Sequence, residues 1–109
     1  SDDLNVILPG PAGFQVEPVP FAGDLGQTAQ PRNPVPLRGL HRLQKAADNR
    51  REPLSTARAL AGLLGCAPFV NTDPRRLECL QTRLCHLLAE IPTDMVYFSR
   101  NEHCWKLFR

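Results

Sequence analysis

The chain has 109 residues, of which 13 are lysine or arginine and 11 are aspartate or glutamate, for a net charge of +2. A chain of this length forms at most one modest domain with an appendage and buries roughly two-thirds of its unfolded surface. This excludes an enclosed substrate cavity beneath a lid. No run approaches the ~18 consecutive apolar residues of a transmembrane helix, so we expect no membrane partner.

The first 36 residues hold seven of the eleven prolines, and four acidic residues against one arginine. Because proline lacks a backbone donor and is excluded from helix interiors, we predict an extended Pro/Gly-rich arm over residues 1–36. Its stretches "LNVIL" and "FQVEPVPF" flank the turn sequence "PGPAG", and they fit either a hairpin or a peptide that adds a strand to a partner's sheet. In the second case Phe14, Val16 and Phe21 are partner-binding residues. A tail in which these apolar residues have no role is the third interpretation.

The next segment is basic, since residues 37–58 hold six basic residues against two acidic ones. Within it, the apolar residues of "LRGLHRLQKAADN" recur at helical spacing after a proline suited to a first helical turn. We therefore predict a first helix over residues 37–49, which ends at "NRREP". An acidic arm before a basic helix indicates either a surface for an anionic partner or an arm that folds back onto its own domain.

Two further helices are predicted. The first covers residues 54–64, where Ser55 caps the first turn and Gly65 ends the helix in the left-handed conformation. The other begins at Asp73, which is followed by a proline, and ends before Pro92. Its leucines recur at spacings of three and four, which predicts one continuous apolar stripe facing a small core.

The last stretch, "DMVYFSRNEHCWKLFR", contains two β-prone runs that predict a C-terminal β-hairpin formed by residues 95–99 and 104–108. Both faces of this hairpin are apolar, so one face is left for the arm or a partner, with Tyr97 and Trp105 as binding residues. The predicted fold class is therefore mainly α. It is a three-helix domain over residues 37–109 with a C-terminal hairpin, preceded by the extended arm, in the element order of a winged helix.

Motifs that carry chemistry are lacking. No serine-nucleophile, phosphate-loop or zinc-protease pattern occurs, and Cys85 and His86 point about 100° apart on a helix. The cysteines lack zinc-site spacing, and Cys79 lies about 9 Å from Cys85 along the helix axis, beyond disulfide reach. We expect a non-enzymatic intracellular protein, in the cytoplasm or nucleus, with reduced thiols and without catalytic residues, metal or cofactor. A disulfide from Cys104 to Cys66 or Cys85 is the alternative.

The predicted function is that of an adaptor or accessory subunit that engages a larger protein through the arm and the hairpin. The alternative is a winged-helix-like, helix-turn-helix module that binds nucleic acid through basic residues of the third helix and the hairpin. Those residues are Arg75, Arg76, Arg83, Arg100 and Lys106. The long loop before the third helix and the near neutrality of the chain after residue 58 argue against this alternative. Homo-oligomerisation through the hairpin is a third prediction.

Overall fold

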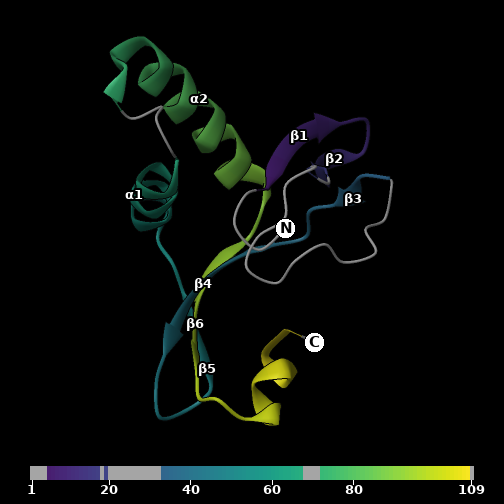
Figure 1. Cartoon of the computed structure of the whole chain (residues 1–109), viewed down its shortest axis with the longest axis vertical. Helices are drawn as coiled ribbons and strands as arrows, with labels where there is room; N and C mark the ends of the chain where they lie inside the picture. The colour runs from purple at the N-terminus through teal and green to yellow at the C-terminus, as the bar shows by residue number, and fades with distance from the viewer. Residues whose placement is uncertain (1–4, 18, 20–32, 68–71, 109) are drawn as a thin grey trace. The chain divides into compact units, whose positions relative to one another are not determined.

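The computed structural model describes residues 5–17, 19, 33–67 and 72–108 and belongs to the mixed α/β class. The chain divides into two compact units, Ser1–Arg38 and Gly39–Arg109. Each unit contains one small three-stranded sheet (Figure 1). The predicted mainly α fold is therefore wrong.

The first unit contains β1 (Val6–Gly10), β2 (Gly13–Glu17) and the short β3 (Val35–Pro36), in the order β1-β2-β3 with antiparallel neighbours. At the end of the β1–β2 hairpin Gly10 pairs with Gly13. Gly13 has a φ of 111°, which residues with a side chain rarely adopt, so this turn requires glycine. Of the structures predicted for this stretch, the hairpin is the one that forms.

The second unit contains β4 (Leu40–Lys45), β5 (Arg50–Pro53) and β6 (Thr93–Phe98), in the order β4-β6-β5. The central strand β6 pairs in parallel with β4 and antiparallel with β5. It carries Met95 and the fully buried Val96, which belong to the core of this unit. The edge strands are largely exposed, so the buried apolar run of the sheet lies on β6.

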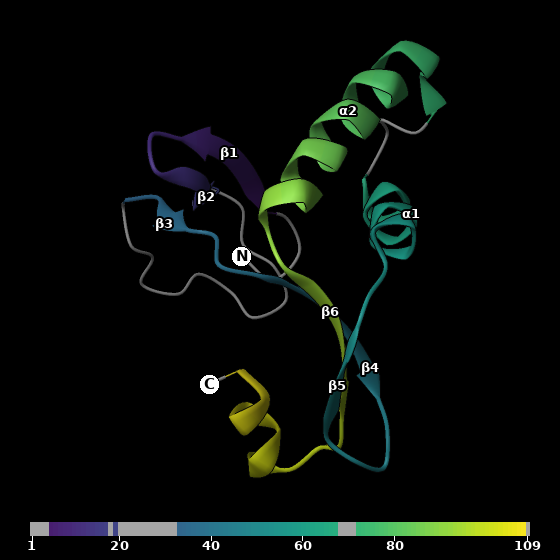
Figure 2. The ribbon, with the colours of Figure 1, turned by 180° about the vertical axis from the view of Figure 1, so that it is seen from behind.

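Two helices, α1 (Thr56–Cys66) and α2 (Pro74–Glu90), connect β5 to β6 and contact each other (Figure 2). Ser55 caps α1 and Asp73 caps α2, each accepting a hydrogen bond from a backbone N–H of the first turn. Both caps confirm the sequence prediction. Leu87, on the leucine stripe of α2, is buried, so the stripe faces the core as its spacing indicates.

The end of α1 differs from its prediction. Gly65 is helical and does not adopt a positive φ, so it does not form the left-handed cap. The helix continues through Cys66, and Ala67 ends it with an extended backbone and an N–H donated to the carbonyl of Leu64.

The first predicted helix, over residues 37–49, is also wrong, because β4 occupies its centre. The helical spacing of its leucines is outweighed by parallel pairing with β6, which runs from Leu40 opposite Thr93 to Lys45 opposite Phe98. This pairing saturates backbone groups that a helix would have satisfied within itself.

The predicted C-terminal hairpin does not form. Its first run becomes β6, but both edges of β6 are already occupied by β4 and β5. Its second run therefore cannot pair with β6, and it forms the 3-10 helix η2 (Glu102–Phe108). Without the hairpin there is no wing, so the winged-helix order is wrong as well.

Candidate functional site

The sheet of the second unit presents different groups on its two faces, because side chains alternate along each strand. One face carries Arg42 and Thr93, and α1 lies against it with a cavity between them. We call this the Arg42 face. The opposite face carries His41, Arg51 and Asp94 and contacts η2, and we call it the His41 face.

Asp94 is the buried centre of a polar cluster on the His41 face. Its Oδ1 lies 2.5 Å from Nδ1 of His41, and its Oδ2 accepts a hydrogen bond from Nε of Arg51 at 2.6 Å. Burial, with only 12% of the side chain exposed, raises the pKa of Asp94, but the hydrogen bonds and charges of His41 and Arg51 outweigh it and lower that pKa below its ordinary value. The cluster therefore holds an ionised carboxylate that joins all three strands.

The C-terminal helix η2 is attached to this cluster. Arg51 donates a hydrogen bond from Nη1 to the carbonyl of Leu107 at 2.9 Å. The ring of Phe108 packs edge-on against His41 with centroids 5.2 Å apart, and Trp105 lies 6.3 Å from Phe108. Trp105 is 67% exposed and Phe108 is 42% exposed, so η2 presents two aromatic rings to solvent beside the cluster.

The outer edge of β4 has no neighbouring strand among the described residues. Leu40 and Ala46 donate their backbone N–H groups toward the β6 side, at 3.0 and 2.8 Å. Because backbone groups alternate in direction along a strand, those of His41, Leu43 and Lys45 face away from the sheet. The side chain of Leu43 is 59% exposed. This edge therefore combines unpaired backbone groups with an exposed apolar residue.

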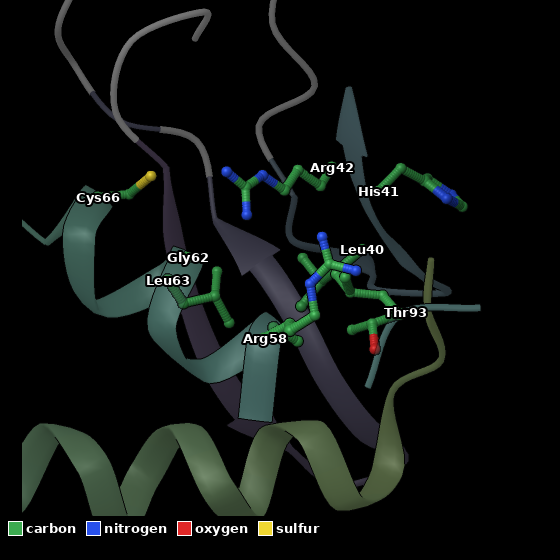
Figure 3. A pocket seen from close by; sticks show the side chains of 10 residues that line it. Leu40, His41, Arg42, Arg58, Gly62, Leu63, Cys66 and Thr93 are labelled. Carbon is green, nitrogen blue, oxygen red and sulfur yellow. The ribbon is translucent and has the colours of Figure 1, made fainter. Parts of the chain in front are cut away.

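A cavity of about 240 Å³ lies between α1 and the Arg42 face. Figure 3 shows the side chains of Arg42 and Arg58 extending into the space between α1 and β4, whereas the ring of His41 points away from it. Neither guanidinium has an ion-pair partner in the described part of the chain. The residues that line the cavity are Leu40, His41, Arg42, Leu54, Arg58, Ala59, Gly62, Leu63, Cys66 and Thr93.

The two predicted binding residues of the hairpin, Tyr97 and Trp105, lie on different parts of the second unit. Tyr97 is half-buried on β6 and projects from the Arg42 face, where the guanidinium of Arg50 lies 3.8 Å from its ring centroid. Trp105 is on η2, which contacts the His41 face. The structure therefore does not join them into the single hairpin surface that the sequence predicts.

Of the three predicted binding residues of the arm, two lie in the described part of the chain. Phe14 and Val16 are half-buried neighbours in β2, where they pair with β1, and Val16 also pairs with β3. Phe21 lies outside the described residues. The described part of the arm is thus already a sheet, and its strands satisfy one another's backbone groups.

The predicted nucleic-acid-binding residues are all exposed. They are Arg75, Arg76 and Arg83 on α2, Arg100 after β6, and Lys106 on η2. The Nε of Arg76 lies 3.5 Å from the carboxylate of Asp73. Because α2 packs against α1 while η2 contacts the His41 face, these residues do not form the helix-and-wing arrangement that the prediction required.

The cluster of His41, Arg51 and Asp94 was not predicted from the sequence, and neither was the pair of arginines at the cavity. The basic character of residues 37–58 was apparent, but a helix was predicted over residues 37–49. A helix there does not place His41 on the same face of a sheet as Arg51 and Asp94. Asp94 gave one local signal, since it directly precedes the apolar run "MVYF" and a buried carboxylate needs partners. Its partners lie 53 and 43 residues away, so no local pattern identifies them.

Other reactive groups are dispersed. Cys66, Cys79, Cys85 and Cys104 are free thiols. Within the described residues, no three or more histidine, cysteine or acidic side chains gather in a way that could hold a metal ion. None of the helices in this part of the chain has the length and apolar character needed to cross a bilayer.

Comparison with known proteins adds no functional assignment. No protein-family model, no curated protein and no solved structure matches this chain. The sites above are therefore interpreted from their own geometry and chemistry.

Proposed function

We propose that the chain is a non-enzymatic adaptor or accessory subunit that binds an extended segment of a larger protein along the outer edge of β4. The observation that carries this proposal is the exposed Leu43 on a strand whose outward backbone groups have no neighbouring strand among the described residues. An added strand would be held there by main-chain hydrogen bonds, and contacts of alternate side chains would supply specificity.

Exposed apolar side chains lie beside this edge. Leu43 shares a strand face with His41, and His41 contacts Phe108, which is a neighbour of Trp105. We call Leu43, Trp105 and Phe108 the Trp105 surface. Contiguous exposed apolar groups mark interaction sites, and aromatic residues such as the neighbouring Trp105 and Phe108 dominate the binding energy of such sites. The Trp105 surface therefore supports contact with apolar residues of the partner.

Charge indicates the kind of segment that fits. β4 carries Arg42 and Lys45, both exposed, and has no acidic residue. Basic side chains on an edge strand hinder pairing with unsuitable strands. An acidic segment is not hindered in this way, because its charges are complementary to those of Arg42 and Lys45. The expected partner segment therefore alternates apolar and acidic residues.

The proposal is tested by selecting binders to the full chain from a random peptide library displayed on phage. We expect enriched peptides that alternate apolar and acidic residues and that protect the backbone amides of Leu43 and Lys45 from hydrogen exchange. Leu43→Asp and Trp105→Ser should each weaken binding of the selected peptide at least about tenfold. The matched control Arg83→Gln, which changes an exposed residue of α2, should leave it unchanged.

Three outcomes would contradict the proposal. The first is that no peptide is enriched, or that the selected peptides bind at α2. The second is binding of duplex DNA that weakens by orders of magnitude between low and physiological salt and is reduced by Arg75→Gln and Arg83→Gln, which would favour a nucleic-acid-binding function. The third is a stable dimer that dissociates in Leu43→Asp, because a second copy would then occupy the edge.

A further inference from the structure

The cavity between α1 and the Arg42 face has an apolar interior. Its walls include Leu40, Leu54, Ala59 and Leu63, and its volume of about 240 Å³ is large enough for a small ligand. Gly62 lies in the wall on the α1 side, where the missing side chain leaves space. The cavity therefore fits a short aliphatic chain.

Two cationic side chains, those of Arg42 and Arg58, lie beside this apolar interior. Nη1 of Arg42 lies 3.7 Å from the point where a Cβ on Gly62 would be, so the guanidinium crosses from β4 to the surface of α1. Arg58 extends from α1 into the same space (Figure 3). Within the described residues no carboxylate pairs with either guanidinium. Two unpaired guanidinium groups beside an apolar wall are complementary to an anion with an aliphatic body.

We infer that this cavity binds a small amphiphilic anion, namely a carboxylate with a short unbranched aliphatic chain. The chain would lie against Leu40 and Leu63, and the carboxylate would accept hydrogen bonds from Arg42 and Arg58. A neutral molecule of the same shape would gain only the apolar contacts, and a cation would be repelled. This inference shares Arg42 with the proposed function, but it uses none of the outward backbone groups of the β4 edge.

The test compares octanoate with two probes of the same length, octan-1-ol and octylammonium. Each is titrated into the full chain while calorimetry reports the affinity and NMR reports the backbone amides. We expect saturable binding of octanoate at one site, with the largest shifts at the amides of Gly62 and Leu63. Octan-1-ol should bind about tenfold more weakly, and octylammonium should not bind measurably.

Matched variants test separately whether octanoate binding depends on the charges of the two arginines and on the space beside Gly62. Arg42→Gln and Arg58→Gln should each weaken octanoate binding about tenfold, because each removes one charge-assisted contact. Arg83→Gln removes the same charge from α2 and should change nothing. Gly62→Leu fills the cavity and should abolish binding, whereas Gly65→Leu adds the same side chain to α1 outside the cavity lining and should not.

The inference is overturned if octan-1-ol binds as tightly as octanoate, or if Arg42→Gln and Arg58→Gln behave like Arg83→Gln while all variants retain the native circular dichroism spectrum. It is also overturned if octanoate shows no saturable binding, whether or not a selected acidic peptide then shifts the amide of Gly62. A shift of the Gly62 amide by the peptide would mean that a side chain of the protein partner occupies the cavity.

Discussion

The carboxylate of Asp94 lies 2.5 Å from Nδ1 of His41, although the two residues are 53 positions apart in the chain. This contact ties the central strand β6 to the edge strand β4. The other carboxylate oxygen ties β6 to β5 through Arg51. A single ionised group thus links the three strands that support both η2 and the cavity.

Asp94→Asn should lower the free energy of unfolding by about 2 kcal/mol at pH 7, because His41 and Arg51 lose their ionised acceptor. The pKa of Asp94 is lowered in the folded state, so its contribution is present above the unfolded pKa of about 3.9 and is lost as the pH falls through the folded pKa. Urea unfolding at pH 7 and pH 3 measures the free energy of unfolding of wild type and variant. The difference between these two free energies should be smaller at pH 3 than at pH 7. An equal difference at both pH values contradicts the assignment.

Val96→Ala should lower the free energy of unfolding by about 2 kcal/mol, because it opens a cavity around the fully buried side chain of the central strand. Leu43→Ala is the matched control, since it truncates an exposed apolar residue on a neighbouring strand and should cost less than about 0.5 kcal/mol. Denaturant titration of both variants gives the comparison. Equal losses of unfolding free energy in the two variants would mean that β6 is not the buried strand.

Ser55→Ala should cost about 1 kcal/mol of unfolding free energy, because the backbone N–H of Arg58 loses the side-chain acceptor that caps α1. Ser55→Asp restores an acceptor at the same position and should recover most of the loss. Thermal unfolding followed by circular dichroism measures both variants. A loss that Ser55→Asp does not recover would argue against the capping role.

Gly65→Ala should stabilise the protein by about 0.5 kcal/mol, since Gly65 is helical and an added Cβ meets no atom within 4 Å. A glycine in a left-handed helix cap would give the opposite sign. Gly13→Ala supplies that contrast, because its φ of 111° makes the same substitution destabilising by about 1 kcal/mol. Urea unfolding of each variant shows whether the substitution raises or lowers the free energy of unfolding.

The two α-helices illustrate what local sequence determines. Ser55 and Asp73 begin α1 and α2 as predicted, since a capping side chain and the N–H that it binds lie within three residues of each other. The stripe that ends in the buried Leu87 also follows from spacing along one helix. The glycine turn of the β1–β2 hairpin is a similar short-range feature.

The segment that forms β4 shows where local sequence is insufficient. Its leucines have helical spacing, and its strand conformation depends on pairing with β6, which lies beyond α1 and α2 in the chain. The run at residues 95–99 was correctly expected to be a strand, but its neighbours were not the expected ones. With both edges of β6 occupied, the segment after it becomes η2 instead of a second strand.

The caps, the two α-helices and the extended character of β6 follow from local sequence, because they depend on contacts within a few residues. Which strands pair is set by the folded chain as a whole. That pairing places His41 and Arg51 on Asp94, brings Arg42 to the cavity and leaves the outer edge of β4 without a neighbouring strand in the described part of the chain. The physical reason is that these contacts join residues more than forty positions apart, whose meeting depends on competition among strands for β6 and not on any local pattern.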